Sequence, residues 1–391
     1  MIFLVLVLFG VQTLCPWAAS RPTSAGPAEL LSPSCDGRAA EEAADLALHH
    51  INAHRREGYV LRLYRIFSVR EHPQEITGSV FYLVLDVVDT ECHVLSKKSW
   101  KDCPARQAHA TVYGQCKAII YINQARNISH LNTYECTLQQ VPRRYIWRVC
   151  PDCPVDDCPT KPEYLEAAAQ SLAKFNQQSE ETRYFSVLNV TRASMQWVVG
   201  PAYFVEFLIQ ETSCSKTDTI ADISQCKPLA PEPAKTGFCK GSVVRSDMEH
   251  KQYVTVSCEI YSPQDPATEE GDQPTTQTPS ETNPFSPHLE KTVGWVRILP
   301  PSTEDMSSQH LPEGQNEHED GNPVPPEVIG ATPGLDGEKT PVDKADLTKP
   351  VTGPVILPFP EELSLSDSCP GEAKETNYII QSLLPKKPTK A

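Results

Sequence analysis

The sequence predicts an α+β protein built from two copies of one unit, in which a helix precedes a set of antiparallel strands. A Glu-Ala-Ala pattern followed by Leu and Asn occurs twice with identical spacing, at residues 42–52 and 166–176. The cysteines that follow repeat their intervals to within one residue, Cys92, Cys103, Cys116 and Cys136 in the first copy and Cys214, Cys226, Cys239 and Cys258 in the second. Such repetition indicates tandem copies of one fold.

Each unit is expected to begin with a helix, because residues 43–52 and 164–176 are rich in Ala and Leu and have acidic residues in or just before the first turn. Runs of β-forming residues follow at 59–63, 80–88 and 117–122, and in the second unit at 184–190, 203–209 and 253–258. Turn residues separate these runs, so we predict antiparallel strands that cover the helix. The simplest disulfides join neighbouring cysteines, although spacing alone does not prove this connectivity: Cys92–Cys103, Cys116–Cys136, Cys214–Cys226 and Cys239–Cys258.

The two ends of the chain differ in composition from the units. Residues 1–14 are almost wholly apolar and small residues follow at 18–20, so residues 1–20 are predicted to be a signal peptide. No later stretch approaches the roughly 20 apolar residues that span a bilayer, and we expect a secreted, extracellular protein. Residues 263–391 are rich in Pro, Glu, Thr, Ser, Gln and Gly, and we predict that they are mostly disordered, with one apolar island at 355–360.

Cysteine usage and sequons agree with an oxidising compartment. Removal of the signal peptide would take Cys15 and leave an odd number of cysteines, so one thiol is left over. Asn127 and Asn189 lie in sequons for N-glycosylation. Cys35 and Cys369 have no partner within the repeat, and a bond between them would tie the C-terminal region to the first unit.

The net charge of −15 argues against nucleic acids and anionic membranes as partners, because both need a cationic surface.

Asp86, Asp89 and Glu91 lie along one predicted strand and its end and would suit calcium or calcium phosphate, although alternation places Asp86 on the opposite face. His50 and His54 have metal-binding spacing, but no third ligand is evident, so we interpret them as part of a solvated helix face.

Two motifs suggest a function. The first is Cys150-Pro151-Asp152-Cys153-Pro154, between the units. It can be a rigid hinge; redox chemistry is disfavoured because an anionic neighbour opposes a thiolate, and a zinc site has no histidine near Cys150, Cys153 and Cys158. The second is Gln196-Trp197-Val198-Val199-Gly200-Pro201, which can be an ordinary hairpin tip.

These motifs, the cysteine framework and the segments 58–63, 112–118 and 357–360 together resemble the fetuin family of the cystatin superfamily. The resemblance implies two cystatin-like domains, residues 35–149 and 161–262, joined by a linker at 150–160. It also implies six disulfides, adding Cys35–Cys369 and Cys150–Cys153 to the four bonds above. Cys158 is extra to this framework and could stay free, pair between molecules, or compete for Cys150 or Cys153.

The resemblance implies a plasma glycoprotein that inhibits astacin-type zinc metalloproteases, including the egg-released protease that hardens the egg coat after fertilisation. We therefore expect a monomeric inhibitor that is not an enzyme, has no cofactor and no metal of its own, and binds neither nucleic acid nor membrane. Asp152 matches the family position whose carboxylate takes the open coordination site of the protease zinc. The bridged turn and its prolines would lower the ordering cost of binding.

The second motif is expected to fill the rest of the protease cleft, with Trp197 as an interface residue of the type that often dominates binding. It also resembles the hairpin with which cystatins enter cysteine proteases. That activity is an alternative, but no glycine lies between Cys153 and the second helix and no tryptophan between Cys239 and Cys258. A carrier of mineral or calcium is the other alternative.

At the position that corresponds to the second motif, the first unit has only Gln74-Glu75-Ile76-Thr77-Gly78, which we interpret as a vestigial loop.

Overall fold

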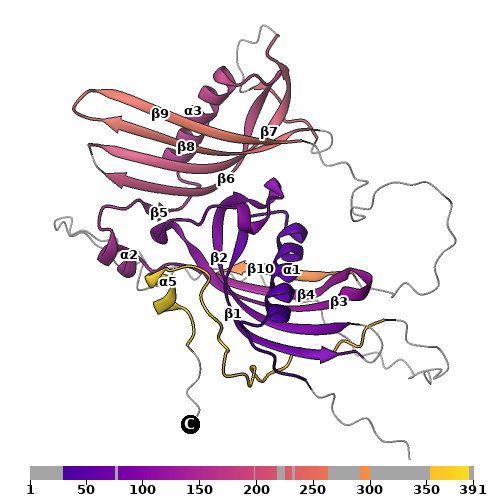
Figure 1. Ribbon diagram of the computed structural model, residues 1–391. Helices are drawn as coiled ribbons and strands as arrows, with labels where there is room; N and C mark the ends of the chain where they lie inside the picture. The colour runs from indigo at the N-terminus through magenta and orange to yellow at the C-terminus, as the bar shows by residue number, and fades with distance from the viewer. Residues whose placement is uncertain are drawn as a thin grey trace, which may run out of the picture.

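The computed structural model describes residues 30–74, 78–197, 199–217, 225–230, 234–262, 291–299 and 353–386. Two five-stranded sheets, each with one long helix packed against it, confirm the predicted α+β class and the repeated unit (Figure 1). The predicted signal peptide lies outside the described residues. Within them, no helix is long and apolar enough to cross a bilayer.

Domain 1 consists of helix α1 (Arg38–His54) and strands β1 (Tyr59–Pro73), β2 (Ser79–His93), β3 (Val112–Asn123) and β4 (Ile128–Gln140). The strands pair antiparallel in chain order. The helix buries a stripe of residues at helical spacing, mostly small ones that allow a close approach to the sheet: Ala40, Ala43, Ala44, Ala47, Leu48 and Ile51. Both the predicted helix and the predicted strands are present and extend further than the sequence runs that indicated them.

Domain 2 repeats this arrangement with helix α3 (Pro162–Gln178) and strands β6 (Arg183–Trp197), β7 (Pro201–Ser215), β8 (Thr236–Ser246) and β9 (Lys251–Tyr261). A short strand, β5 (Val155–Asp157), is added at the outer edge of β6. Sequence analysis missed β4, β5 and β8; β5 has only three residues, and Gly237 and Gly241 interrupt β8.

The repeated asparagine has one structural role in both domains. Asn52 donates to the carbonyl of Leu61 and accepts from its backbone N–H, at 2.9 and 2.8 Å. Asn176 does the same with Phe185, at 2.8 and 3.0 Å. Each side chain thus ties the last turn of the helix to the first strand, which explains why the helix motif and the strand that follows are repeated together.

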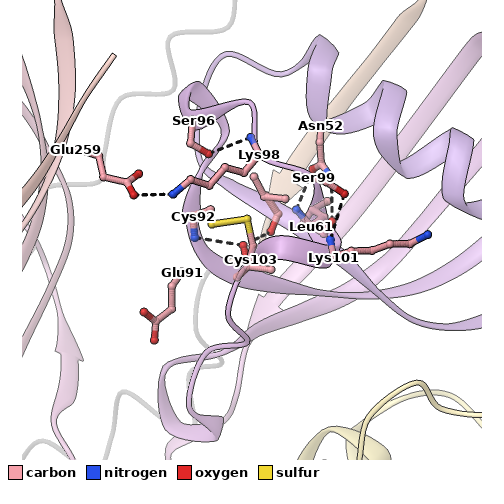
Figure 2. Close-up of a disulfide and its surroundings, with 12 residues drawn as sticks. Asn52, Leu61, Glu91, Cys92, Ser96, Lys98, Ser99, Lys101, Cys103 and Glu259 are labelled. Carbon is pink, nitrogen blue, oxygen red and sulfur yellow. Dashed lines mark hydrogen bonds and ion pairs between the residues drawn. A yellow bond between two sulfur atoms is a disulfide. The ribbon is translucent and has the colours of Figure 1, made fainter.

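All six disulfides that the resemblance implies are formed, with Cα–Cα distances between 4.0 and 5.7 Å. Cys116 and Cys136 lie directly opposite each other on β3 and β4, as do Cys239 and Cys258 on β8 and β9. Cys92–Cys103 closes the loop after β2, beside which Lys98 reaches Glu259 of domain 2 (Figure 2).

Two stretches of the C-terminal region, which composition predicts to be mostly disordered, are folded onto domain 1 (Figure 1). Strand β10 (Val293–Ile298) pairs with β4 in parallel. In the second stretch, 353–386, Phe359 packs edge-on against Tyr82, and helix α5 (Tyr378–Leu383) buries Ile380. The bond from Cys35 to Cys369 holds this segment to the start of α1. These segments cover apolar and tyrosine side chains on the outer face of the sheet.

The acidic strand is not a surface for cations. Asp86 is fully buried and its carboxylate is 2.6 Å from the guanidinium of Arg65. Asp89 is also buried, at 3% exposure, and is paired with arginine. His50 and His54 of α1 also have hydrogen-bond partners, the hydroxyl groups of Ser129 and Tyr134, at 2.9 Å each. Among the described residues there is no cluster of three side chains suited to a metal ion.

The α5 helix is expected to be an integral part of domain 1. Ile380→Ala should lower the free energy of unfolding of that domain by about 2–4 kcal/mol, because it opens a cavity in a fully buried position. Tyr378→Ala on the same helix is the matched control; its side chain is 79% exposed, and we expect a change within about 0.5 kcal/mol. Calorimetry of both variants measures the difference, and equal effects would contradict the role given to α5.

His93 makes the stability of the domain boundary dependent on pH. Its ring stacks on Phe238 of domain 2, and its Nδ1 accepts a hydrogen bond from the backbone of Leu95. Burial, together with the charge of Arg55, lowers the pKa of His93 from 6.5 to about 4. Between these values the unfolded chain binds more protons than the folded one. The contribution of neutral His93 to the free energy of unfolding is therefore complete above pH 6.5 and is lost as the pH falls toward 4.

His93→Gln keeps an acceptor for Leu95 and removes the titration. We expect this variant to lose about 2–3 kcal/mol less of its free energy of unfolding than the parent between pH 6.5 and 4. Asp89, whose pKa burial raises to about 6, acts in the opposite direction in both proteins and cancels in the comparison. Urea unfolding at several pH values provides the measurement; parallel profiles would rule the histidine out.

Candidate functional site

The linker motif forms a tight turn, residues 150–154, between the two domains; we call it the linker turn. Helix α2 (Arg143–Val149) leads into it from domain 1, and the N–H of Cys150 donates to the carbonyl of Ile146 at 2.8 Å. The Cys150–Cys153 disulfide closes the turn over a Cα–Cα distance of 5.3 Å. Pro151 and Asp152 are exposed at its tip. Within the described residues, the Asp152 carboxylate makes no hydrogen bond or ion pair and is free to bind a partner.

The second motif is the tip of the β6–β7 hairpin; we call residues 196–201 the second hairpin. Trp197 is opposite Pro201 in the strand register, and its side chain is 65% exposed. Gly200 has a φ of +143°, and a Cβ there would lie 2.1 Å from the carbonyl oxygen of Arg245. Only glycine fits this close approach of two backbones, so Gly200 sets the shape of the tip.

The structure brings the linker turn and the second hairpin together. Strand β5 continues directly from the turn and pairs with β6, with Val155 opposite Met195. The side-chain amide of Gln196 donates to the backbone carbonyl of Asp152. The turn and the hairpin therefore project from one edge of the domain 2 sheet, near the boundary with domain 1 (Figure 1). The spacing in the sequence did not indicate this contact.

Exposed apolar side chains surround the linker turn, and sequence analysis missed them. Trp147 and Val149 on α2 are 46% and 68% exposed, and Met195 beside the second hairpin is 37% exposed. Arginine stacks on the aromatic rings of α2, with Arg143 lying over Trp147. Clusters of this kind mark interaction surfaces. The signal in the sequence was the run of aromatic and basic residues immediately before Cys150.

Gln74, where the equivalent hairpin of domain 1 begins, contacts the C-terminal region. The Gln74 side chain accepts from the N–H of Val355 at 2.8 Å and donates to its carbonyl at 3.3 Å. Residues 75–77 lie outside the described residues. The two hairpins therefore differ in surroundings, and the interpretation of the first as a vestigial loop stays a prediction.

Five charged residues connect the two domains and the linker; we call them the interdomain ion network. Asp156 on β5 is 2.6 Å from Arg192 on β6, and Arg192 is 3.6 Å from Asp89 of domain 1. Arg106 of domain 1 lies 3.0 Å from Asp89 and donates two hydrogen bonds of 2.9 Å to Glu206 on β7. Charges of opposite sign alternate along this chain of contacts, and the side chains of Asp89 and Arg106 are only 4% and 5% exposed.

Burial and pairing have opposite effects on the carboxylates of this network. Burial raises the pKa of Asp89 to about 6 in spite of Arg106 and Arg192. For Glu206, burial also acts to raise the pKa, but the hydrogen bonds and charge of Arg106 outweigh it and hold the pKa below its usual value. Both groups are therefore mainly ionised at neutral pH.

The remaining predicted sites are on the surface. Asn127 and Asn189 are exposed, as glycosylation requires. Cys158 is an exposed free thiol outside the linker turn and lies 3.0 Å from the hydroxyl of Thr160. A hydrogen bond from Thr160 lowers the pKa of this thiol.

Comparison with known proteins agrees with the fold. The family model "Cystatin domain" matches residues 32–124 and 153–246. Human fetuin-B is 37% identical over 377 residues, which is 95% of this chain and 97% of the relative. Mouse fetuin-B is 37% identical over 355 residues, covering 86% and 87%. Sheep alpha-2-HS-glycoprotein is 33% identical over 262 residues, covering 66% and 69%.

Two solved structures extend the comparison to partners. Mouse fetuin-B in complex with crayfish astacin has a TM-score of 0.62 and 34% identity, covering 92% of this chain and 99% of that chain. The inhibitory complex of human meprin beta with mouse fetuin-B has a TM-score of 0.53 and 39% identity, covering 66% and 86%. Identity over nearly the whole length, the two cystatin domains and the shared fold establish that this chain belongs to the fetuin-B family of cystatin-domain proteins.

Proposed function

We propose that the protein is a secreted inhibitor of astacin-type zinc metalloproteases that binds with the linker turn and the second hairpin and performs no chemistry itself. One observation carries the proposal: an exposed carboxylate, Asp152, stands on a disulfide-closed turn directly beside an exposed hairpin. The complexes of mouse fetuin-B with astacin and meprin beta support the class of target.

The linker turn would act on the metal of the protease. A catalytic zinc keeps one coordination position open for the water that attacks the substrate. The Asp152 carboxylate is a suitable oxygen ligand and would displace that water. Because the turn is closed by a disulfide and flanked by Pro151 and Pro154, little conformational entropy is lost when the carboxylate binds.

The second hairpin would occupy the cleft on the other side of the zinc. Trp197 and Val199, at 65% and 48% exposure, present apolar surface that is unfavourable in water and favourable in an interface. Its contact with Asp152 through Gln196 keeps the two elements at a fixed separation. Neither element alone would block a cleft that the pair can fill.

We further propose that the egg-released protease that hardens the egg coat is among the targets, which would give the protein a role in fertilisation. This part rests on family membership. Inhibition must be stoichiometric and must not consume the inhibitor as a substrate. Titration of that protease with the purified glycoprotein tests it directly.

Asp152→Asn is the decisive variant. The neutral amide keeps the shape of the side chain but is a poor zinc ligand, so we expect the inhibition constant to rise by about 100-fold. Asp102→Asn is the matched control, because Asp102 is also an exposed carboxylate beside a disulfide cysteine but belongs to domain 1. Inhibition constants against an astacin-type protease, measured for the parent and both variants, provide the test.

The competing functions give different results in the same assays. Unchanged inhibition by Asp152→Asn would show that the linker turn does not chelate the zinc. Tight inhibition of papain together with an untouched metalloprotease would make the second hairpin a cystatin-type inhibitor of cysteine proteases. Suppression of calcium phosphate precipitation without any effect on proteases would favour a mineral carrier.

A further inference from the structure

We propose that Asp156 and Arg192 are positioning residues for the linker turn: their ion pair couples the position of the Asp152 carboxylate to the relative orientation of the two domains. This inference rests on the proposed function, because it concerns how the inhibitory carboxylate is aimed.

Asp156 lies two residues after Pro154 and is contacted from both domains. Its Oδ2 is 2.6 Å from a terminal nitrogen of Arg192, and its Oδ1 accepts from Nε of the same guanidinium at 3.4 Å. Gln140, at the end of β4 in domain 1, donates to Oδ2 at 3.4 Å. The first charged side chain after the linker turn is therefore held at the domain boundary.

Arg192 connects this residue to the rest of the interdomain ion network. It is opposite Glu206 in the β6–β7 register, so these two residues of domain 2 move as one unit. Each reaches domain 1 by its own contact, Arg192 to Asp89 and Glu206 to Arg106. Two parallel ionic links thus fix the angle between the sheets at the point where the linker crosses.

The domain boundary next to the linker turn is not closely packed. A half-open pocket of about 240 Å³ lies there, lined by Pro154 and Asp156 together with Arg106, Arg192 and Glu206. A turn supported by a close-packed core would be located by side-chain contacts. Beside an open pocket fewer such contacts are available, and we infer that the ion pairs lining it help to locate the turn.

The two ends of the linker turn are attached to different domains. On the N-terminal side, α2 contributes to a hydrophobic cluster of domain 1 through Tyr145 and Ile146. On the C-terminal side, β5 is paired with β6 of domain 2. A change in the angle between the domains would therefore displace one end relative to the other. Because the disulfide keeps the turn rigid, Asp152 would move with it. A displacement of about 1 Å is enough to impair the alignment of a zinc ligand with the metal.

The test begins with Asp156→Asn and Arg192→Lys, which keep size but weaken the pair. We expect Asp156→Asn to raise the dissociation rate of the protease complex about tenfold and Arg192→Lys to raise it by a smaller factor. The six disulfides should be unchanged, and the rates are compared at a temperature well below the unfolding midpoint of every variant. Lys98→Met is the matched control, because it removes another interdomain ion pair, Lys98–Glu259 (Figure 2), whose side chains are 46% and 50% exposed. Glu259 belongs to β9, at the opposite edge of the domain 2 sheet from β5 and the linker turn.

The effect of Asp156→Asn is then measured again in the Asp152→Asn background. If Asp156 acts by aiming Asp152, it has little further effect there, less than about twofold. Full additivity would overturn the inference, and so would a dissociation rate that changes equally in the Lys98→Met control. Failure of Asp152→Asn to impair inhibition would instead refute the proposed function, so the two failures can be told apart.

Discussion

The ion pairs of alternating carboxylate and guanidinium groups between the two cystatin domains are the interaction on which the placement of the linker turn depends. Buried charges carry a large desolvation cost, and their mutual attraction offsets it only when the geometry is good. Another arrangement of the domains would leave some of these charges buried and unpaired, so we infer that the network disfavours it. The forked hydrogen bonds from Arg106 to Glu206 allow a single orientation of the two groups. The position of the linker turn follows from that orientation.

The two domains share one fold and have different surfaces. In domain 1, the outer face of the sheet is covered by the segment 353–386, which is tied to the start of α1 by a disulfide and reaches the first hairpin at Gln74. In domain 2, the second hairpin is exposed and bears Trp197. The duplicated fold therefore gives two scaffolds with different surfaces, and under the proposed function the second presents the hairpin to the protease. The linker turn lies between them and uses both.

Rigidity at the site is achieved locally, from several directions. The disulfide restricts the backbone conformations of the linker turn, and Gly200 allows the hairpin to approach the backbone of Arg245 closely. The side chain of Gln196 joins the hairpin to the turn. An inhibitor needs such preorganisation because flexible segments lose entropy on binding. The exposed apolar residues around the turn then contribute surface burial without having to be ordered first.

The sequence by itself determined the repeated unit, the helices and most strands, since periodicity and cysteine intervals are local patterns that survive without a structure. It also singled out the linker turn and the second hairpin, because their residue types are unusual. The tertiary structure alone decided that Gln196 contacts Asp152, that Asp86 and Asp89 are buried ion partners instead of surface ligands, and that Arg106 meets Glu206 across the domain boundary. These contacts join residues up to a hundred positions apart. Their formation depends on how two sheets pack, and no local pattern records that.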